Sequence, residues 1–172
     1  RWNNYGSNGS ETRPPRAISG TDTPPRATTK MSETGAVPET VVFDAEPLIA
    51  YFSDEPGSDT VEQYLTAVEG ATTGYISAVN AAELHYIVRG NAGLERAETV
   101  MEVLEESGIQ RISTDELWRK AADFKFGYSL ALGDAFALAA AAVVNGTLLV
   151  GADDDFANVT DLPITRFRTD PA

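Results

Sequence analysis

From residue 41 onward, short apolar runs alternate with longer stretches in which apolar positions recur at helical spacing. The short runs are rich in β-branched or aromatic residues and predict strands over 41–43, 74–77, 109–113, 147–150 and 163–167. The stretches between them predict helices over 46–52, 57–71, 79–90, 94–108, 116–129 and 130–145. Thr114 or Asp115 is expected to cap the fifth of these helices. Strands separated by helices are typical of parallel βαβ units, so the predicted fold class is α/β, a three-layer α/β/α domain with a central parallel sheet.

Residues 1–40 lack this pattern. They are rich in Pro, Gly, Ser and Thr and contain almost no aliphatic residues. Such a segment buries too little apolar surface to offset the entropy of ordering. We therefore expect a disordered N-terminal segment over 1–40, a folded domain over 41–168 and a short tail over 169–172. The sequence begins with Arg, and Met31 is a candidate natural start just before the first predicted strand.

Four acidic residues stand in apolar surroundings. Asp134 is the only charged residue of its predicted helix, and Glu83 is the only formally charged residue over 70–88. Asp44 and Asp153 directly follow two predicted strands. Because ligands of parallel sheets bind outside the carboxyl ends of the strands, this placement indicates a shared site.

Each acid also has a purely structural explanation. Asp44 could cap the helix that follows it, Glu83 could lie on a solvated helix face, and Asp134 could be an N-cap. Asp153 could be a turn residue within "GADDD". These explanations do not account for the joint placement of the four carboxylates.

Composition narrows the chemistry open to these acids. The chain has no cysteine, which excludes disulfides, a thiol nucleophile and zinc sites built on cysteine. Its single histidine, His85, excludes sites built from several histidines. Carboxylates remain the main supply of metal ligands, and hard oxygen donors suit Mg²⁺ or Mn²⁺. Four carboxylates in a dry cleft would repel one another, and one or two divalent cations would relieve that repulsion.

The order and spacing of the four acids resemble the PIN domain, especially the small VapC-type toxin ribonucleases. The resemblance covers about residues 41–168. It rests on "VVFDAEPLIAYF", "YISAVNAAELHYIV", "LGDAFALAAA" and "LLVGADDDF", taken in that order. It implies that Asp44, Glu83, Asp134 and Asp153 are catalytic and bind Mg²⁺ or Mn²⁺, with Asp155 as a further candidate ligand.

The resemblance also implies an activity and partners. We expect an endoribonuclease that hydrolyses RNA phosphodiester bonds, and specifically the toxin of a type II toxin–antitoxin pair. A homodimer and a cognate protein antitoxin that blocks the cleft follow from the same resemblance. The chain departs from the family at Gly151, where members often carry Thr or Ser two residues before the fourth acid. That departure implies a fourth ligand that is less well fixed.

Several polar residues near the acids are further candidates. Ser77 and Asn80 are expected to orient the metal ligands from behind. Arg89 and Lys125 are candidates for contacts to RNA phosphates, the alternative being solvated helix charges. His85 lies two residues after Glu83, so we expect it on another side of the helix, in a structural role.

The charge balance is strongly acidic. Residues 41–172 carry 8 basic and 22 acidic side chains, a net charge of −14. One explanation is binding to a basic partner. The favoured explanation is halophilic adaptation, because a salty cytoplasm screens the repulsion among acidic side chains. There is neither an apolar run of 18 residues nor a secretory pattern, so we expect an intracellular, cytoplasmic protein.

Two other functions remain open. A haloacid-dehalogenase-like phosphatase also has an Asp after its first strand, but that family needs a second Asp where Glu46 stands here. A non-catalytic PIN-like module that binds RNA or protein is the second alternative. Retention of all four acids argues against it, while Gly151 and the acidic surface keep it open. Metal-dependent cleavage of RNA would separate these functions from the nuclease.

Overall fold

The computed structural model describes residues 36–152 and 154–169. The predicted disorder of the N-terminal segment, as far as position 35, lies outside the described residues. The same holds for Asp153 and for the end of the predicted tail, from position 170 onward.

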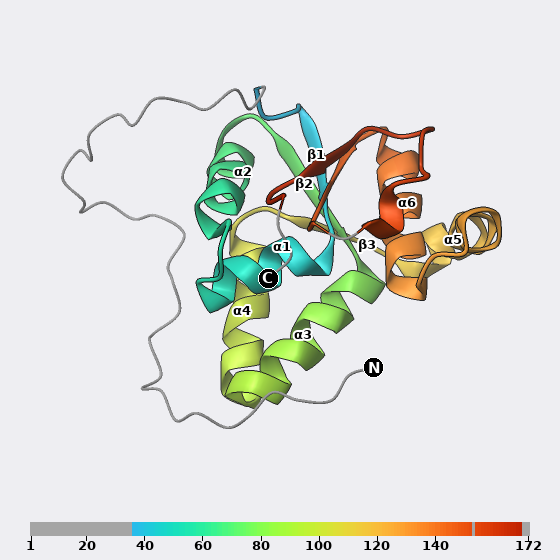
Figure 1. Cartoon of the computed structure of the whole chain (residues 1–172). Coiled ribbons are helices and arrows are strands. Elements are labelled where there is room, and N and C mark those ends of the chain that lie inside the picture. Colours follow the sequence, from blue (N-terminus) through green and yellow to red (C-terminus); the bar gives the residue numbers. More distant parts are fainter. Residues whose placement is uncertain (1–35, 153, 170–172) are drawn as a thin grey trace.

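A five-stranded parallel sheet forms the centre of the molecule, with the strand order β3-β2-β1-β4-β5 (Figure 1). The strands are β1 (Thr40–Phe43), β2 (Thr73–Ser77), β3 (Gln110–Ile112), β4 (Thr147–Val150) and β5 (Ile164–Arg166). All five correspond to predicted strands, and the α/β fold class with a parallel sheet is confirmed.

Six helices and one short 3₁₀ helix surround the sheet. They are α1 (Ala45–Ser53), α2 (Ser58–Gly70), α3 (Ala78–Ala92), α4 (Leu94–Glu106), α5 (Thr114–Tyr128), α6 (Leu132–Val144) and η1 (Asp154–Phe156). One prediction about their ends is wrong: Ser113, not Thr114 or Asp115, is the N-cap of α5. The Ser113 hydroxyl donates to Glu116 Oε1 at 2.8 Å instead of accepting from the backbone.

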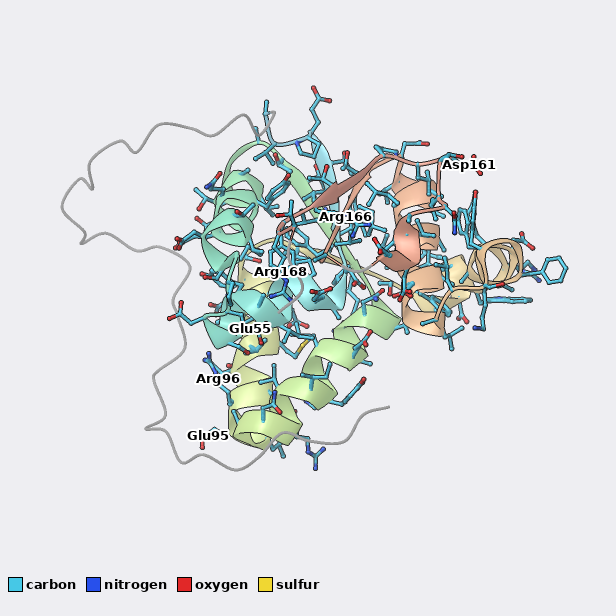
Figure 2. The ribbon with its side chains drawn as sticks, viewed as in Figure 1. Glu55, Glu95, Arg96, Asp161, Arg166 and Arg168 are labelled. Carbon is cyan, nitrogen blue, oxygen red and sulfur yellow. The ribbon has the colours of Figure 1, made fainter. Side chains whose placement is uncertain are left out.

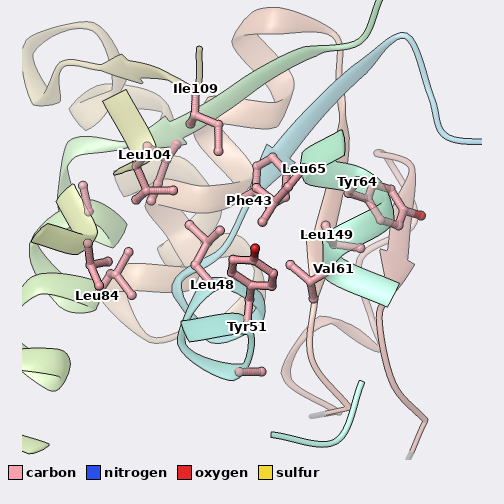
Figure 3. Packing of buried hydrophobic residues seen from close by; sticks show 14 of the residues in the cluster. Phe43, Leu48, Tyr51, Val61, Tyr64, Leu65, Leu84, Leu104, Ile109 and Leu149 are labelled. Carbon is pink, nitrogen blue, oxygen red and sulfur yellow. The ribbon is translucent and has the colours of Figure 1, made fainter. Parts of the chain in front are cut away.

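Side chains alternate along the central strands and divide the core between two layers. Val41 and Phe43 of β1 pack with α1–α4, whereas Val42 packs with α5 and α6. Figure 3 shows the first of these clusters, in which Phe43 lies among side chains of α1, α2 and β4. Helices therefore cover both faces of the sheet, which is the three-layer arrangement (Figure 1).

The position of β1 determines where a site can form. β1 pairs with both β2 and β4, and Phe43 lies opposite Ile76 on one side and Leu149 on the other. The connection to β2 runs through α1 and α2 on one face, while α5 and α6 lead to β4 on the other face. Ligands of open α/β sheets bind at such a reversal of connection, at the carboxyl ends of the strands.

Helix α6 is the most apolar helix of the described chain, and its residues from Ala135 to Ala141 are buried. It ends at Val144, and its C-cap residue Asn145 adopts a left-handed conformation with φ of 51°, which Asn tolerates better than most residues. Among the described helices, none is long and apolar enough by itself to cross a membrane. Only α5 and α6 taken together pass that test, as a pair bent by 119°.

The acidic surface leads to a prediction about salt. Because residues 41–172 carry a net charge of −14, we expect the melting temperature to rise by several degrees between 0.2 M and 2 M KCl through screening of self-repulsion. A Glu102→Gln/Glu106→Gln variant, altered at two exposed positions of α4, should depend less on salt. Thermal unfolding followed by circular dichroism measures both. A melting temperature that stays flat for the parent protein would contradict halophilic adaptation.

Candidate active site

Asp44 lies at the carboxyl end of β1 and is buried, with 8% of its surface exposed. Its backbone N–H donates to Leu149 O at 3.1 Å, which ties this residue to the neighbouring strand β4. Asp44 occupies the N-cap position of α1, but its side chain makes no capping hydrogen bond. Helix capping therefore does not explain why a carboxylate is buried here.

Asn80 on α3 and Ser77 at the end of β2 orient the side chain of Asp44. Asn80 Nδ2 donates to Asp44 Oδ1 at 2.8 Å and to Gly133 O at 3.3 Å. Ser77 caps α3, because its hydroxyl oxygen accepts the Asn80 N–H at 3.0 Å. The same hydroxyl donates to Asn80 Oδ1, so the amide NH₂ group points toward Asp44 and α6. Both residues are fully buried, and this chain of hydrogen bonds satisfies their side chains.

Asp134 lies in the first turn of α6. The helix begins at Leu132 with Ala131 as its N-cap, so the alternative in which Asp134 caps the helix is wrong. A carboxylate in a first turn is favoured by the positive end of the helix dipole.

Gly133 brings the start of α6 close to Glu83 of α3. A Cβ at this glycine would lie 2.9 Å from Glu83 Oε2, which is tighter than normal packing allows. The absence of a side chain therefore lets the Glu83 carboxylate approach the turn that carries Asp134. The packing of α3 against α6 thus brings the second and third predicted acids together.

The charges of Asp134 and Glu83 both act on the buried carboxyl group of Asp44. Burial raises the pKa of Asp44 to about 7; repulsion by Asp134, Glu83 and Glu46 contributes to the rise, and the N–H of Ala45 opposes it. Burial also raises the pKa of Glu83, and the charge of Asp134 adds to that rise. Such mutual repulsion is the state that the sequence predicts for clustered acids without a cation.

The chemistry of this donor set fits a hard divalent ion, since it consists of carboxylate oxygens in a partly dry setting. Within residues 36–152 and 154–169, however, no group of three or more Asp, Glu or His side chains is arranged so that it could hold a metal ion. Among the predicted ligands, Asp44, Glu83 and Asp134 lie in the described part of the chain, and their role as donors stays a prediction. Asp153, the fourth predicted ligand, lies outside the described residues, and Asp155 is exposed in η1.

His85 and Lys125 have partners away from the three carboxylates. His85 Nε2 lies 3.2 Å from Glu98 Oε1, and this contact joins α3 to α4, as the predicted structural role requires. Lys125 Nζ donates to Leu130 O at 2.8 Å and so holds the connection between α5 and α6. The Lys125 ammonium therefore supports the segment that leads to Asp134, while its contact to RNA stays a prediction.

Sequence reasoning missed Glu46 as part of this site. Its charge contributes to the raised pKa of Asp44, and its carboxylate lies against Gly151 at the end of β4. The signal was present in the sequence, because Glu46 follows Asp44 by two residues in "FDAEP". Its contact with Gly151 depends on the pairing of β1 with β4.

The comparison with protein families decides what kind of domain carries this site. A family model described as PIN domain matches residues 41–162. The chain belongs to the PIN-domain family. The predicted family is thus confirmed over most of the chain, and the match includes all four predicted acids. No curated protein matches the sequence.

Solved structures agree with this PIN-domain assignment at the level of the fold. A toxin–antitoxin complex from Klebsiella pneumoniae has a TM-score of 0.57 and 20% identity, and the match covers 74% of this chain and 98% of that chain. VapBC-1 from nontypeable Haemophilus influenzae has a TM-score of 0.61 and 15% identity, with the same coverage of 74% and 98%. VapC20 from Mycobacterium tuberculosis, described as a toxin that cleaves the sarcin–ricin loop, has a TM-score of 0.56 and 11% identity, covering 68% and 92%.

Proposed function

We propose that this PIN domain is a metal-dependent endoribonuclease that hydrolyses RNA phosphodiester bonds. One observation carries the proposal: just after β1, burial and repulsion by the carboxylates of Glu83 on α3 and Asp134 on α6 raise the pKa of Asp44 to about 7. A cluster of this kind is costly unless a cation or protons offset its charge. The toxins of similar fold, one of which is described as cleaving RNA, support the same activity.

The residues have two kinds of role in this proposal: carboxylates hold the ion, and an amide orients one of them. Asp44, Glu83 and Asp134 hold Mg²⁺ or Mn²⁺, with Asp153 as the predicted fourth ligand. A bound divalent ion would supply Lewis acidity and positive charge for hydrolysis of a phosphodiester. Asn80 holds Asp44 in one orientation, so the carboxylate needs little reorganisation when a cation binds.

The RNA strand needs positive or stacking groups near the carboxylates. Tyr86 and Arg89 lie one and two turns after Glu83 on α3, and both are exposed. Arg89 is the predicted phosphate contact, and Tyr86 offers a face on which a base can stack. Residues three apart on a helix are neighbours on its surface, so the exposed face of α3 leads away from Glu83.

A toxin role is the more specific part of the proposal. Four of the similar solved structures are described as toxin–antitoxin or VapBC proteins, which supports a cognate antitoxin for this chain as well. The homodimer stays a prediction from the family resemblance. Expression of this chain together with a small protein from the neighbouring reading frame should suppress the RNA cleavage seen with the chain alone. Cleavage that persists at a stoichiometric excess of that protein would indicate a nuclease outside a toxin–antitoxin pair.

The activity itself can be tested with the full chain. Mixed-sequence RNA oligonucleotides, transfer RNA and ribosomal RNA fragments are incubated at low and high KCl with Mg²⁺, Mn²⁺ or EDTA. Internal cleavage with either metal and none with EDTA is the expected result. RNA binding without cleavage would favour the non-catalytic alternative, and release of phosphate from a phosphomonoester without RNA cleavage would favour the phosphatase.

A further inference from the structure

Glu46 lies between two chain segments that come from the far end of the sequence. Its Oε1 atom is 2.5 Å from Arg168 Nη2, just after β5. Its other oxygen lies so close to Gly151 that a Cβ at this glycine would be only 1.7 Å from Glu46 Oε2. The Glu46 carboxylate thus fills the space that a side chain at position 151 would need.

Arg168 is held firmly in this position. Its side chain is only 10% exposed, and its guanidinium lies 4.9 Å from the ring centroid of Phe167. Besides Glu46, the guanidinium contacts Glu55 Oε2 at 3.5 Å and donates to Pro56 O at 3.4 Å. Figure 2 shows Arg168 between Arg166 and Glu55, alongside α1. One arginine therefore connects the end of β5 with the first turn of α1 and with the loop after it.

Gly151 is held from a second direction as well. Arg166 Nη1 donates to Gly151 O at 2.9 Å. The Phe167 N–H donates to Val150 O at 3.0 Å and extends the pairing of β5 with β4. The turn after β4 is therefore fixed by Arg166 at its carbonyl and by Glu46 at its Cα.

We propose that Glu46 and Arg168 are positioning residues of the candidate metal site, which hold the turn after β4 against Asp44. The inference rests on the proposed function. It makes the segment 164–168 part of the active site, although none of its residues is a predicted ligand. Glu46 acts through Gly151 and Asp44, and Arg168 acts through Glu46.

The charges of this pair explain why the two residues occur together. Glu46 alone would add another negative charge two residues from Asp44, in a cluster that already repels itself. Arg168 offsets that charge with a short, largely buried ion pair, and charge-assisted contacts of this kind are stronger and more directional than exposed ones. The carboxylate can then occupy the space beside Gly151 without increasing the net charge of the site.

The first test is a double-mutant cycle between positions 46 and 151. Gly151→Ala should displace the Glu46 carboxylate and lower kcat for RNA cleavage at least tenfold. In a Glu46→Ala background the same substitution should cost less than twofold, because the added methyl group fits the vacated space. Equal losses in both backgrounds would overturn the proposed contact.

The second test separates positioning from simple stabilisation. Arg168→Gln should lower kcat at least tenfold, with KM for RNA changed less than twofold, and should at least halve the rise in melting temperature produced by Mn²⁺. Arg168→Lys keeps the charge and should recover part of both, and it remains informative if Arg168→Gln fails to fold. Arg111→Gln, which breaks an exposed pair with Glu105 at 3.5 Å, is the matched control and should change neither.

The outcomes are distinct. A lower metal-free melting temperature with an unchanged Mn²⁺ response and unchanged kcat would make the pair merely structural and overturn the proposal. An increased Mn²⁺ response in Arg168→Gln would also overturn it, because Glu46 would then act as a ligand that Arg168 restrains. If the parent protein neither cleaves RNA nor responds to Mn²⁺, the proposed function itself fails.

Discussion

Asp134→Asn is expected to lower RNA cleavage by about a hundredfold or more while the fold survives. The substitution keeps the size and shape of the side chain but removes one of the three described carboxylates. Loss of a group that only orients a metal ligand costs about 10–100-fold in affinity or activity, and a direct ligand should cost at least as much. Because mutual repulsion falls, the metal-free variant should be as stable as the parent protein or more so.

Two assays on this variant check the prediction. RNA cleavage measures the activity, and thermal unfolding with and without Mg²⁺ or Mn²⁺ measures the stabilisation that a bound ion gives by mass action. Asp123→Asn, which removes a charge from an exposed position of α5, is the matched control and should change neither assay. A fully active Asp134→Asn protein would contradict the assignment of Asp134 as a metal ligand.

The second prediction with a large effect concerns stability and pH. In the folded protein the pKa of Asp44 is raised to about 7 from an ordinary value of 3.8. The folded state therefore binds more protons than the unfolded state between these two values, and the contribution of Asp44 to stability falls as pH rises through that window. Asp44→Asn should consequently stabilise the metal-free protein at pH 8, by about 2–4 kcal/mol.

The Asp44→Asn variant keeps an oxygen that can accept from Asn80, so the hydrogen bond at 2.8 Å need not be lost. Urea unfolding in EDTA at intervals from pH 4.5 to pH 8 should show a flatter pH dependence for the variant than for the parent protein. The exposed Asp123→Asn control should follow the parent curve. A variant that is less stable than the parent at pH 8 would mean that the ionised carboxylate of Asp44 stabilises the fold by contacts that outweigh its burial.

The elements of the fold could be predicted because they depend on local patterns. A three-residue apolar run such as "VVF" is buried on both sides of a sheet, and the spacing of apolar residues in "LERAETVMEVLEE" permits one buried helix face. The sequence also predicted which acids form the site, and that assignment stays a prediction. Asp134 and Glu83 stand alone among apolar residues, and an isolated charge in such a stretch needs a partner or a ligand.

The contacts among the site residues could be seen only in the tertiary structure. Nothing in the local pattern shows that Asn80 donates to Asp44, 36 residues away, or that Gly133 makes room for the Glu83 carboxylate. These contacts arise because β2 and β4 flank β1 in register and because α3 packs against α6.

Gly151 shows the difference most clearly. From the sequence it was a departure from the family pattern, implying a fourth ligand that is less well fixed. In the structure the same glycine makes room for Glu46, whose partner Arg168 is 122 residues further along the chain. Sequence periodicity alone predicted the strands, the helices and the position of Asp44 at the end of the first strand, because short-range sterics and burial decide those features. Which side chains meet between β1, β4 and β5 was decided only by the packed sheet, since contacts between residues far apart in the chain depend on how the whole domain closes.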